Sequence, residues 1–296
     1  MSGQLRLIIV SGLSGSGKSV ALHVLEDIGY YCIDNLPAGL LIAAVDEVRR
    51  NSGDAAKLLA VGVDARNHAE NLDNLPDLLR ELRSQGVKTD IIFLHASDEI
   101  LLQRYRETRR RHPLAEQGTQ LRAAIESERT FLAEIQLSAD LVIDTSQSSI
   151  YELADVIRSR VDKRDTESLS VLIESFGFKY GIPSDADFVF DLRSLPNPYW
   201  TLELRGLSGF DEEVREFLDA QESFAAMFDD IRDFLGRWVP HYESTNRGYL
   251  TVAIGCTGGQ HRSVYMTEKL AAELRNHHDA VLTRHNSLAE HRLRQD

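Results

Sequence analysis

The 296-residue chain is poor in cysteine and in positive charge. Its two cysteines, Cys32 and Cys256, lie far apart, so neither a disulfide framework nor a cysteine-rich metal site is expected. Lysine and arginine together number 33 against 46 acidic residues, and the formal net charge is −13. This balance argues against a protein that is covered by nucleic acid over its whole surface, although it leaves room for a local basic patch.

Long hydrophobic runs and a signal-like start are also lacking. No apolar stretch of the sequence is long enough to cross a bilayer as a helix. The first residues, Met1 to Gln4, have neither the positive charge nor the apolar core of a secretory signal. We therefore expect a cytoplasmic protein. The length is sufficient for two domains, each with its own core.

Short apolar runs alternate with amphipathic, helix-like stretches over the first half of the chain. The expected strands are 5–10, 31–33, 58–63, 91–94 and 141–143, and the expected helices are 20–27, 38–50, 72–83, 99–110, 121–135 and 150–160. This alternation predicts an α/β fold, a doubly wound parallel sheet with helices on both faces. The charged segment 160–167 is the expected linker, so that residues 1–160 form the first domain.

The second half starts again with a strand-like run and predicts a second, smaller α/β domain over residues 168–296. Its expected strands are 170–176, 188–192, 249–254 and 280–283. A long acidic helical region is expected from about Asp211 to Trp238, with an apolar stripe toward the core. A further helix is expected from His261 to His277.

A phosphate-binding loop of the form G-x-x-x-x-G-K-S follows the first expected strand and opens the first expected helix. Its residues are Gly12, Leu13, Ser14, Gly15, Ser16, Gly17, Lys18 and Ser19. Glycines let backbone N–H groups converge, and the helix N-terminus adds a positive dipole. In this motif Lys18 would reach the β- and γ-phosphates, and Ser19 would bind Mg²⁺.

Besides the Ser19 hydroxyl, a carboxylate is expected near the magnesium ion, at the end of a neighbouring strand. Asp64 follows the run 58–63 and is the first candidate, both as a metal ligand and, with Lys18, as a catalytic residue. Asp34 and Asp144 are alternatives. Asp144 is expected rather to cap the next helix or to hydrogen-bond within its own loop, whereas Asp34 could contact a substrate.

The densest basic run of the chain lies between Arg104 and Arg111 and is followed by His112 and Pro113. One interpretation is a lid whose arginines clamp a transferred phosphate, as in small-molecule kinases. The other is a solvated helix end that is stabilised by the helix dipole. The pattern alone leaves both open.

A second glycine loop, from Gly255 to Val264, also connects a strand to a helix. It contains Cys256, Thr257, Gly258, Gly259, Gln260, His261, Arg262 and Ser263. One interpretation is a non-catalytic site for a phosphate or sugar phosphate. The spacing C-x-x-G-x-x-R-S also matches a cysteine-dependent phosphatase, but Gly255 stands where those enzymes carry histidine. A purely structural turn is the third alternative.

Seven segments in order along the chain resemble the RapZ/YvcJ family of bacterial P-loop proteins. They are 11–19, 34–37, 64–67, 108–114, 174–181, 195–198 and 255–264. The resemblance implies an N-terminal domain that binds ATP and GTP and hydrolyses them slowly. It further implies a C-terminal domain that senses glucosamine-6-phosphate and binds small regulatory RNA, as an adapter for an endoribonuclease. The resemblance also implies assembly as a homo-oligomer, and we expect a tetramer.

The resemblance also assigns residues. Asp64, Ala65, Arg66 and Asn67 match the family's GTP motif, while Lys179, Thr257, Gly258, His261 and Arg262 match its contacts to RNA or sugar phosphate. Cys256, Gly259 and Ser263 complete that second site. Family members that act as RNA adapters have lysine where this chain has Gln260, and histidine where it has Tyr199. They also end in a basic tail, whereas residues 292–296 of this chain contain only two arginines. Each lost cation weakens attraction to a phosphate backbone.

Overall fold

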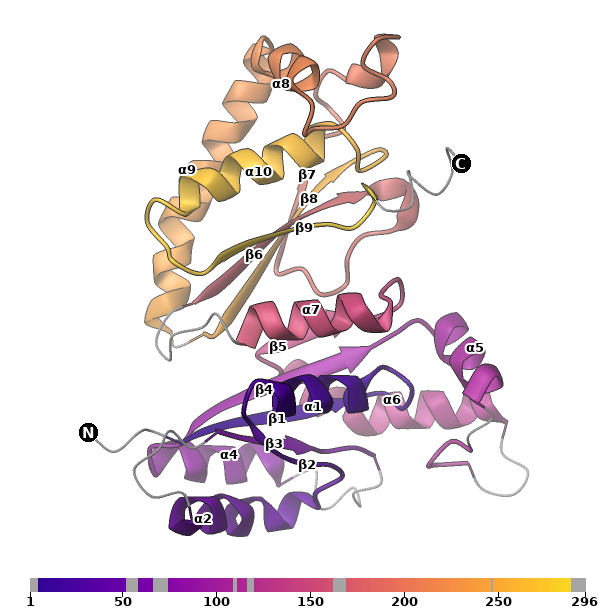
Figure 1. Cartoon of the computed structure of the whole chain (residues 1–296), viewed down its shortest axis with the longest axis vertical. Coiled ribbons are helices and arrows are strands. Elements are labelled where there is room, and N and C mark those ends of the chain that lie inside the picture. The colour runs from indigo at the N-terminus through magenta and orange to yellow at the C-terminus, as the bar shows by residue number, and fades with distance from the viewer. Residues whose placement is uncertain are drawn as a thin grey trace. The chain divides into compact units, whose positions relative to one another are not determined.

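The computed structural model describes residues 5–51, 58–65, 74–108, 111–115, 120–161, 169–245 and 247–288. The chain divides into two compact units, 1–162 and 163–296 (Figure 1). Each unit has a parallel sheet and its own hydrophobic core, so the α/β class predicted for both halves is confirmed. Within the described residues, no helix is long and apolar enough to cross a membrane.

The first unit is built on a five-stranded parallel sheet. The strands are β1 (Arg6–Gly12), β2 (Tyr31–Ile33), β3 (Leu58–Gly62), β4 (Lys88–His95) and β5 (Leu141–Asp144), in the order β2-β3-β1-β4-β5. Every residue of the central strand β1 is buried. Burial on both faces explains why the sequence shows continuous apolar runs rather than alternation.

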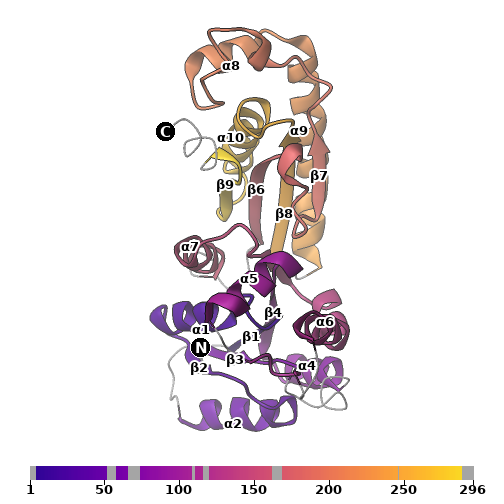
Figure 2. The same cartoon turned by 90° about the vertical axis from the view of Figure 1, so that its right-hand side faces the viewer.

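Helices cover both faces of this sheet (Figure 2). Helices α1 (Lys18–Asp27) and α7 (Ile150–Val161) pack together on one face, and α4 (Leu75–Ser84) and α6 (Leu121–Leu137) cover the other. The remaining elements are α2 (Leu41–Asn51), the 3₁₀ turn η1 (Ala38–Leu40) and α5 (Asp98–Thr108). The expected start of α4 at Leu72 and the expected end of α5 at Arg110 lie outside the described residues.

The register of the sheet brings several strand ends to one edge. Gly12 of β1 lies opposite Leu94 of β4, and Val10 lies opposite Gly62 of β3. The loops that follow β1, β3, β4 and β5 therefore meet at the carboxyl edge, where open α/β sheets bind ligands.

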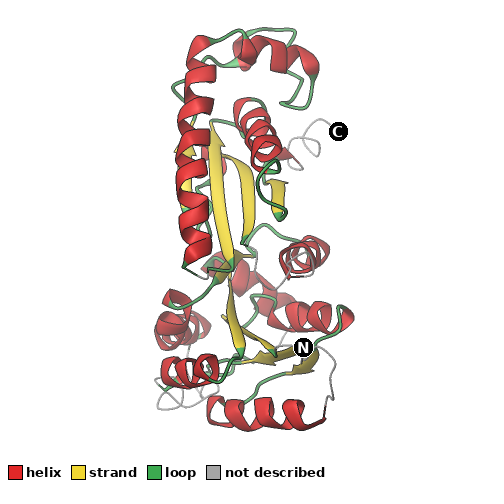
Figure 3. Cartoon of the chain, turned by 90° about the vertical axis from the view of Figure 1, so that its left-hand side faces the viewer, coloured by secondary structure: helices red, strands yellow, loops and turns green. Residues whose placement is uncertain are grey.

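The second unit has a four-stranded parallel sheet in the order β7-β8-β6-β9. Its strands are β6 (Ser170–Gly177), β7 (Phe188–Asp191), β8 (Tyr249–Cys256) and β9 (Val281–His285). Helices α9 (Glu222–Ser244) and α10 (Arg262–Leu274) cover opposite faces of this sheet (Figures 2 and 3). Two 3₁₀ turns, η2 (Phe178–Tyr180) and η3 (Pro198–Trp200), lie in its connections.

The helical region expected from about Asp211 to Trp238 is present but is not continuous. The structure has two helices, α8 (Glu212–Asp219) and α9. Gln221 is extended, with φ −96° and ψ 114°, and caps the start of α9. The break changes the chain's direction so that Val214 of α8 and Phe224 of α9 both enter the core. No proline or glycine marks this break, and α9 continues through Pro240 to Ser244.

Candidate functional site

The loop between β1 and α1 has the backbone of an anion-binding turn. Gly12, Gly15 and Gly17 have φ values of 140°, 91° and 106°, which favour glycine strongly. A side chain at Gly12 would collide with the carbonyl oxygen of Leu94. Gly17 is the N-cap of α1, so the first amides of that helix open onto the loop.

Side chains from α5 and from the end of β5 hold the carbonyl groups of this loop. Arg104 Nη1 donates to the Gly15 oxygen at 2.9 Å, and Thr145 Oγ1 lies 3.0 Å from the Ser16 oxygen. Arg104 also donates to the Thr145 oxygen at 2.7 Å. Since the C=O and N–H groups of a trans peptide point in opposite directions, fixing the Ser16 carbonyl turns the Gly17 N–H the other way.

Three polar side chains of this turn, those of Lys18, Ser19 and Ser16, differ in exposure. Lys18 is half-buried and its Nζ donates to the Gly12 oxygen at 2.6 Å, whereas Ser19 is exposed in the first turn of α1. The Ser16 hydroxyl is buried and has no hydrogen-bond partner among the described residues. A cation, a helix N-terminus and a buried hydroxyl in one turn fit a phosphate group.

Asp64 lies at the same edge of the sheet as the loop. It is only 3% exposed, and the preceding residue, Val63, donates its N–H to the Val10 oxygen at 3.0 Å. Asp34 is exposed at the end of β2. Asp144 accepts hydrogen bonds from the N–H and hydroxyl of Ser146, which confirms the expectation that it hydrogen-bonds in its own loop.

The family's GTP motif is described only in part. Asp64 and Ala65 are buried, and Arg66 and Asn67 lie outside the described residues.

Part of the basic run is also outside the described residues, namely Arg109 and Arg110. Arg106 and Arg111 are exposed. Arg104 is held against the backbone of the phosphate loop, so it supports that loop. Arg104 is therefore not a free clamp, and the lid interpretation concerns the other arginines of the run.

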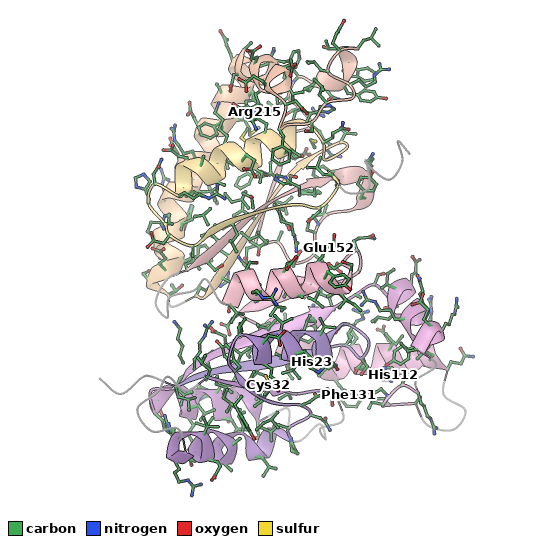
Figure 4. The ribbon with its side chains drawn as sticks, viewed as in Figure 1. His23, Cys32, His112, Phe131, Glu152 and Arg215 are labelled. Carbon is green, nitrogen blue, oxygen red and sulfur yellow. The ribbon has the colours of Figure 1, made fainter. Side chains whose placement is uncertain are left out.

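Sequence reasoning missed a carboxylate that contacts the phosphate loop directly. Glu128 of α6 is fully buried and accepts hydrogen bonds from the Ser14 N–H at 2.8 Å and hydroxyl at 2.6 Å. Its other partner is His112, at 3.1 Å. Figure 4 labels His112 in the first unit. A signal was present, because Glu128 falls on the buried face of α6 together with Ile125 and Leu132.

The second glycine loop connects β8 to α10 in the second unit. Cys256 is 3% exposed, and its Sγ accepts the Gly259 N–H at 3.2 Å and lies 3.2 Å from the Ser263 hydroxyl. Gly259 has φ 69°, and a side chain there would meet Ser287. The thiol thus faces the inside of its own loop.

Arg262 is turned into the protein. It is 2% exposed, and its Nη1 lies 3.2 Å from the oxygens of Leu192 and Arg193 and 2.7 Å from that of Leu195. Nη2 donates to the Thr257 hydroxyl at 3.3 Å. Burial lowers the pKa of Arg262, and Cys256 and Asp191 act in the opposite direction. The guanidinium therefore ties the loop to the segment after β7.

The exposed part of this loop is flanked by cationic side chains. Thr257 is exposed, and its oxygen accepts the N–H of Lys179, which is also exposed. Arg193, which sequence reasoning missed, stacks 3.8 Å from the centre of the Phe178 ring and pairs with Asp191. The hydrogen bonds from Arg193 lower the pKa of Asp191.

The remaining residues of the loop face inward. His261 Nε2 lies 3.1 Å from the Leu204 oxygen, and Gln260 donates to the Leu207 oxygen at 2.5 Å. Of the predicted second site, the structure therefore gathers Lys179, Thr257 and Gly258 near the surface and places Cys256, Gly259, His261, Arg262 and Ser263 behind them.

The fold defines a two-domain α/β protein in which each domain has a glycine-rich loop between a strand and a helix. Residues 5–165 match the family model of the RapZ-like N-terminal domain, and residues 169–289 match that of the RapZ C-terminal domain. The chain belongs to the RapZ family.

Relatives of similar length support this assignment. A protein from Thioalkalivibrio sulfidiphilus that is named a nucleotide-binding protein is 52% identical over 286 residues, which cover 96% of this chain and 100% of that protein. A relative from Pseudomonas fluorescens with the same kind of name is 50% identical over 285 residues, with 96% and 100% covered.

Among solved structures, a shikimate kinase from Bacteroides thetaiotaomicron matches 54% of this chain and 99% of its own. That match has 16% identity and a TM-score of 0.35, values too low to bear on activity.

Proposed function

We propose that the first unit binds ATP and GTP with Mg²⁺ at Gly12–Ser19 and hydrolyses them slowly. The observation that carries this proposal is the loop itself, in which glycines at positive φ precede the amides of α1 and fixed carbonyls direct the N–H of Gly17. The names of the relatives, which call them nucleotide-binding proteins, agree with it.

Two oxygen ligands fit a magnesium ion at this edge of the sheet. The exposed Ser19 hydroxyl and the Asp64 carboxylate belong to elements that the sheet register brings together, and hard oxygen donors are the ligands that Mg²⁺ prefers. When bound, the ion neutralises phosphate charge. Lys18 would leave the Gly12 oxygen and contact the terminal phosphates.

Isothermal calorimetry with Lys18→Ala tests the nucleotide site. We expect weaker ATP and GTP binding by about 1.5–3 kcal/mol, the range for a hydrogen bond to a charged group, and no hydrolysis. Lys88→Ala at the opposite end of the sheet is the control and should bind normally. Unchanged affinity in a folded Lys18→Ala protein would refute the assignment. Transfer of phosphate to a small acceptor, instead of release to water, would indicate a kinase.

For the second unit we propose a site for glucosamine-6-phosphate at the loop between β8 and α10, which shares its surface with RNA phosphates. Lys179, Thr257 and Gly258 would contact the ligand, with His261 and Arg262 behind them. The match of residues 169–289 to the RapZ C-terminal domain supports this proposal. The glycines of the loop and its position at a helix N-terminus support it as well. A homotetramer that delivers RNA to an endoribonuclease is part of the same proposal.

A competition assay between glucosamine-6-phosphate and RNA tests the second proposal. Glucosamine-6-phosphate should displace bound RNA, and Lys179→Ala should weaken both ligands, while Lys269→Ala, whose amine is paired with Asp219, should not. RNA affinity should fall steeply as salt rises, because it depends on phosphate neutralisation. Turnover of phosphate esters that disappears in Cys256→Ser would instead establish phosphatase chemistry.

A further inference from the structure

Glu128 contacts the loop that is proposed to bind phosphate, yet it is itself an anion. Its side chain is completely buried on α6, and its two carboxylate oxygens are taken up by donors. Oε1 accepts the Ser14 hydroxyl, and Oε2 accepts both the Ser14 N–H and His112 Nε2. A carboxylate with three donors is well satisfied in its charged form.

The protonation of His112 follows from its other neighbour. The Leu114 N–H donates to His112 Nδ1 at 3.1 Å, so that nitrogen carries no proton. The proton of the neutral ring is therefore on Nε2 and points to Glu128. Burial alone would raise the pKa of Glu128, but the hydrogen bonds from His112 and Ser14 and the charge of Lys18 hold it below its usual value.

The charged groups around this carboxylate belong to the nucleotide site. Lys18 attracts it, and the Tyr105 hydroxyl lies near it, with a pKa raised to about 12 by burial and then by the charge of Glu128. Asp64 adds a further negative charge that acts on Tyr105. An incoming polyphosphate would therefore meet a fixed negative charge that shares its lysine.

We propose that Glu128 is an internal anion that competes with the terminal phosphate of the nucleotide for the N–H and hydroxyl of Ser14. The proposal rests on nucleotide binding by this loop. In this arrangement Glu128 limits the affinity of the loop for a triphosphate and makes that affinity depend strongly on Mg²⁺, which offsets the repulsion. It is a specificity-determining residue, because each added phosphate charge is opposed by the carboxylate.

The substitution Glu128→Gln removes the charge and keeps the contacts. With its oxygen in place of Oε2, glutamine still accepts the Ser14 N–H and His112 Nε2, and its amide group in place of Oε1 donates to the Ser14 hydroxyl oxygen. The matched control is Glu134→Gln, an exposed residue of the same helix. Thermal melts of both variants check that the fold is intact.

Calorimetry of ATP and ADP, each with and without Mg²⁺, tests the proposal. We expect Glu128→Gln to bind Mg²⁺-free ATP roughly 10- to 30-fold tighter than the unmodified protein, from the Coulomb term of one removed charge. The gain should be smaller for ADP and for the magnesium complex, and Glu134→Gln should show none. Unchanged or weaker ATP binding by folded Glu128→Gln would overturn the proposal.

The unmodified protein provides a second measurement in case Glu128→Gln does not fold. Without Mg²⁺ it should bind ATP no more tightly than ADP, because the third phosphate meets Glu128. A large preference for Mg²⁺-free ATP would contradict the proposal. If the unmodified protein binds neither nucleotide under any condition, the proposed nucleotide site fails, which is a different outcome from a failure of the competition.

Discussion

Replacement of Thr145 by valine tests whether the phosphate loop depends on its anchored carbonyls. The Thr145 side chain is 1% exposed, and its hydroxyl lies 3.0 Å from the Ser16 oxygen, 3.1 Å from the His95 oxygen and 3.0 Å from Arg104 Nη1. Valine has nearly the same shape but neither donates nor accepts. The substitution therefore removes the hydroxyl that contacts the Ser16 carbonyl and the Arg104 guanidinium.

The expected cost follows from those contacts. A buried polar group that loses its partner costs about 1–3 kcal/mol. In a domain of this size that loss corresponds to a drop in Tm of roughly 3–10 °C. Nucleotide affinity should fall as well, since the Ser16 carbonyl would no longer fix the direction of the Gly17 N–H.

Differential scanning calorimetry and nucleotide titration measure both effects. Thr130→Val is the matched control, because Thr130 is exposed on α6 and its hydroxyl donates to the Glu126 carbonyl of the same helix. That variant should change Tm by no more than about 1–2 °C, as surface substitutions do. If Thr145→Val is no more destabilising than Thr130→Val, the anchoring argument is refuted.

Three further predictions concern both units. Gly12→Ala should fail to give a folded first unit, as judged by circular dichroism, because its Cβ would meet the Leu94 backbone. Arg284→Leu should lower the free energy of unfolding by about 3–5 kcal/mol in urea, since it leaves the buried carboxylate of Glu174 without its cation. Burial already raises the Glu174 pKa, so this loss should shrink as pH falls and the carboxyl protonates. Arg262→Lys should lower Tm and weaken sugar-phosphate binding together, and normal stability with lost binding would instead indicate direct contact.

Local patterns predicted most of the fold. The run of apolar residues from Leu5 to Val10, the glycines of Gly12–Ser19 and the start of α1 are neighbours in sequence, and each acts over a few residues. The break between α8 and α9 was not predictable in this way. It has neither proline nor glycine, and tertiary packing of Val214 and Phe224 in one core decides it.

The site could be predicted only where its residues are contiguous. Glu128 lies 114 residues from Ser14 in the sequence, so no motif joins them. Its position on the apolar face of α6 indicates burial but names no partner. Arg104 shows the same limit, because the basic run left a clamp and a solvated helix end open, and only the structure gives this arginine a backbone carbonyl of the loop.

The two glycine loops share a sequence pattern but differ in what they expose. In the first, Ser19 is exposed and Lys18 half-buried, so their hydroxyl and amine can reach a ligand from the first turn of α1. In the second, Cys256 and Arg262 are almost fully buried, and Arg262 Nη1 already faces three backbone carbonyls. A thiolate nucleophile needs access and a guanidinium directed at the phosphate. In the second loop both the thiol and the guanidinium are turned inward, which is why we propose a sensor there rather than an enzyme.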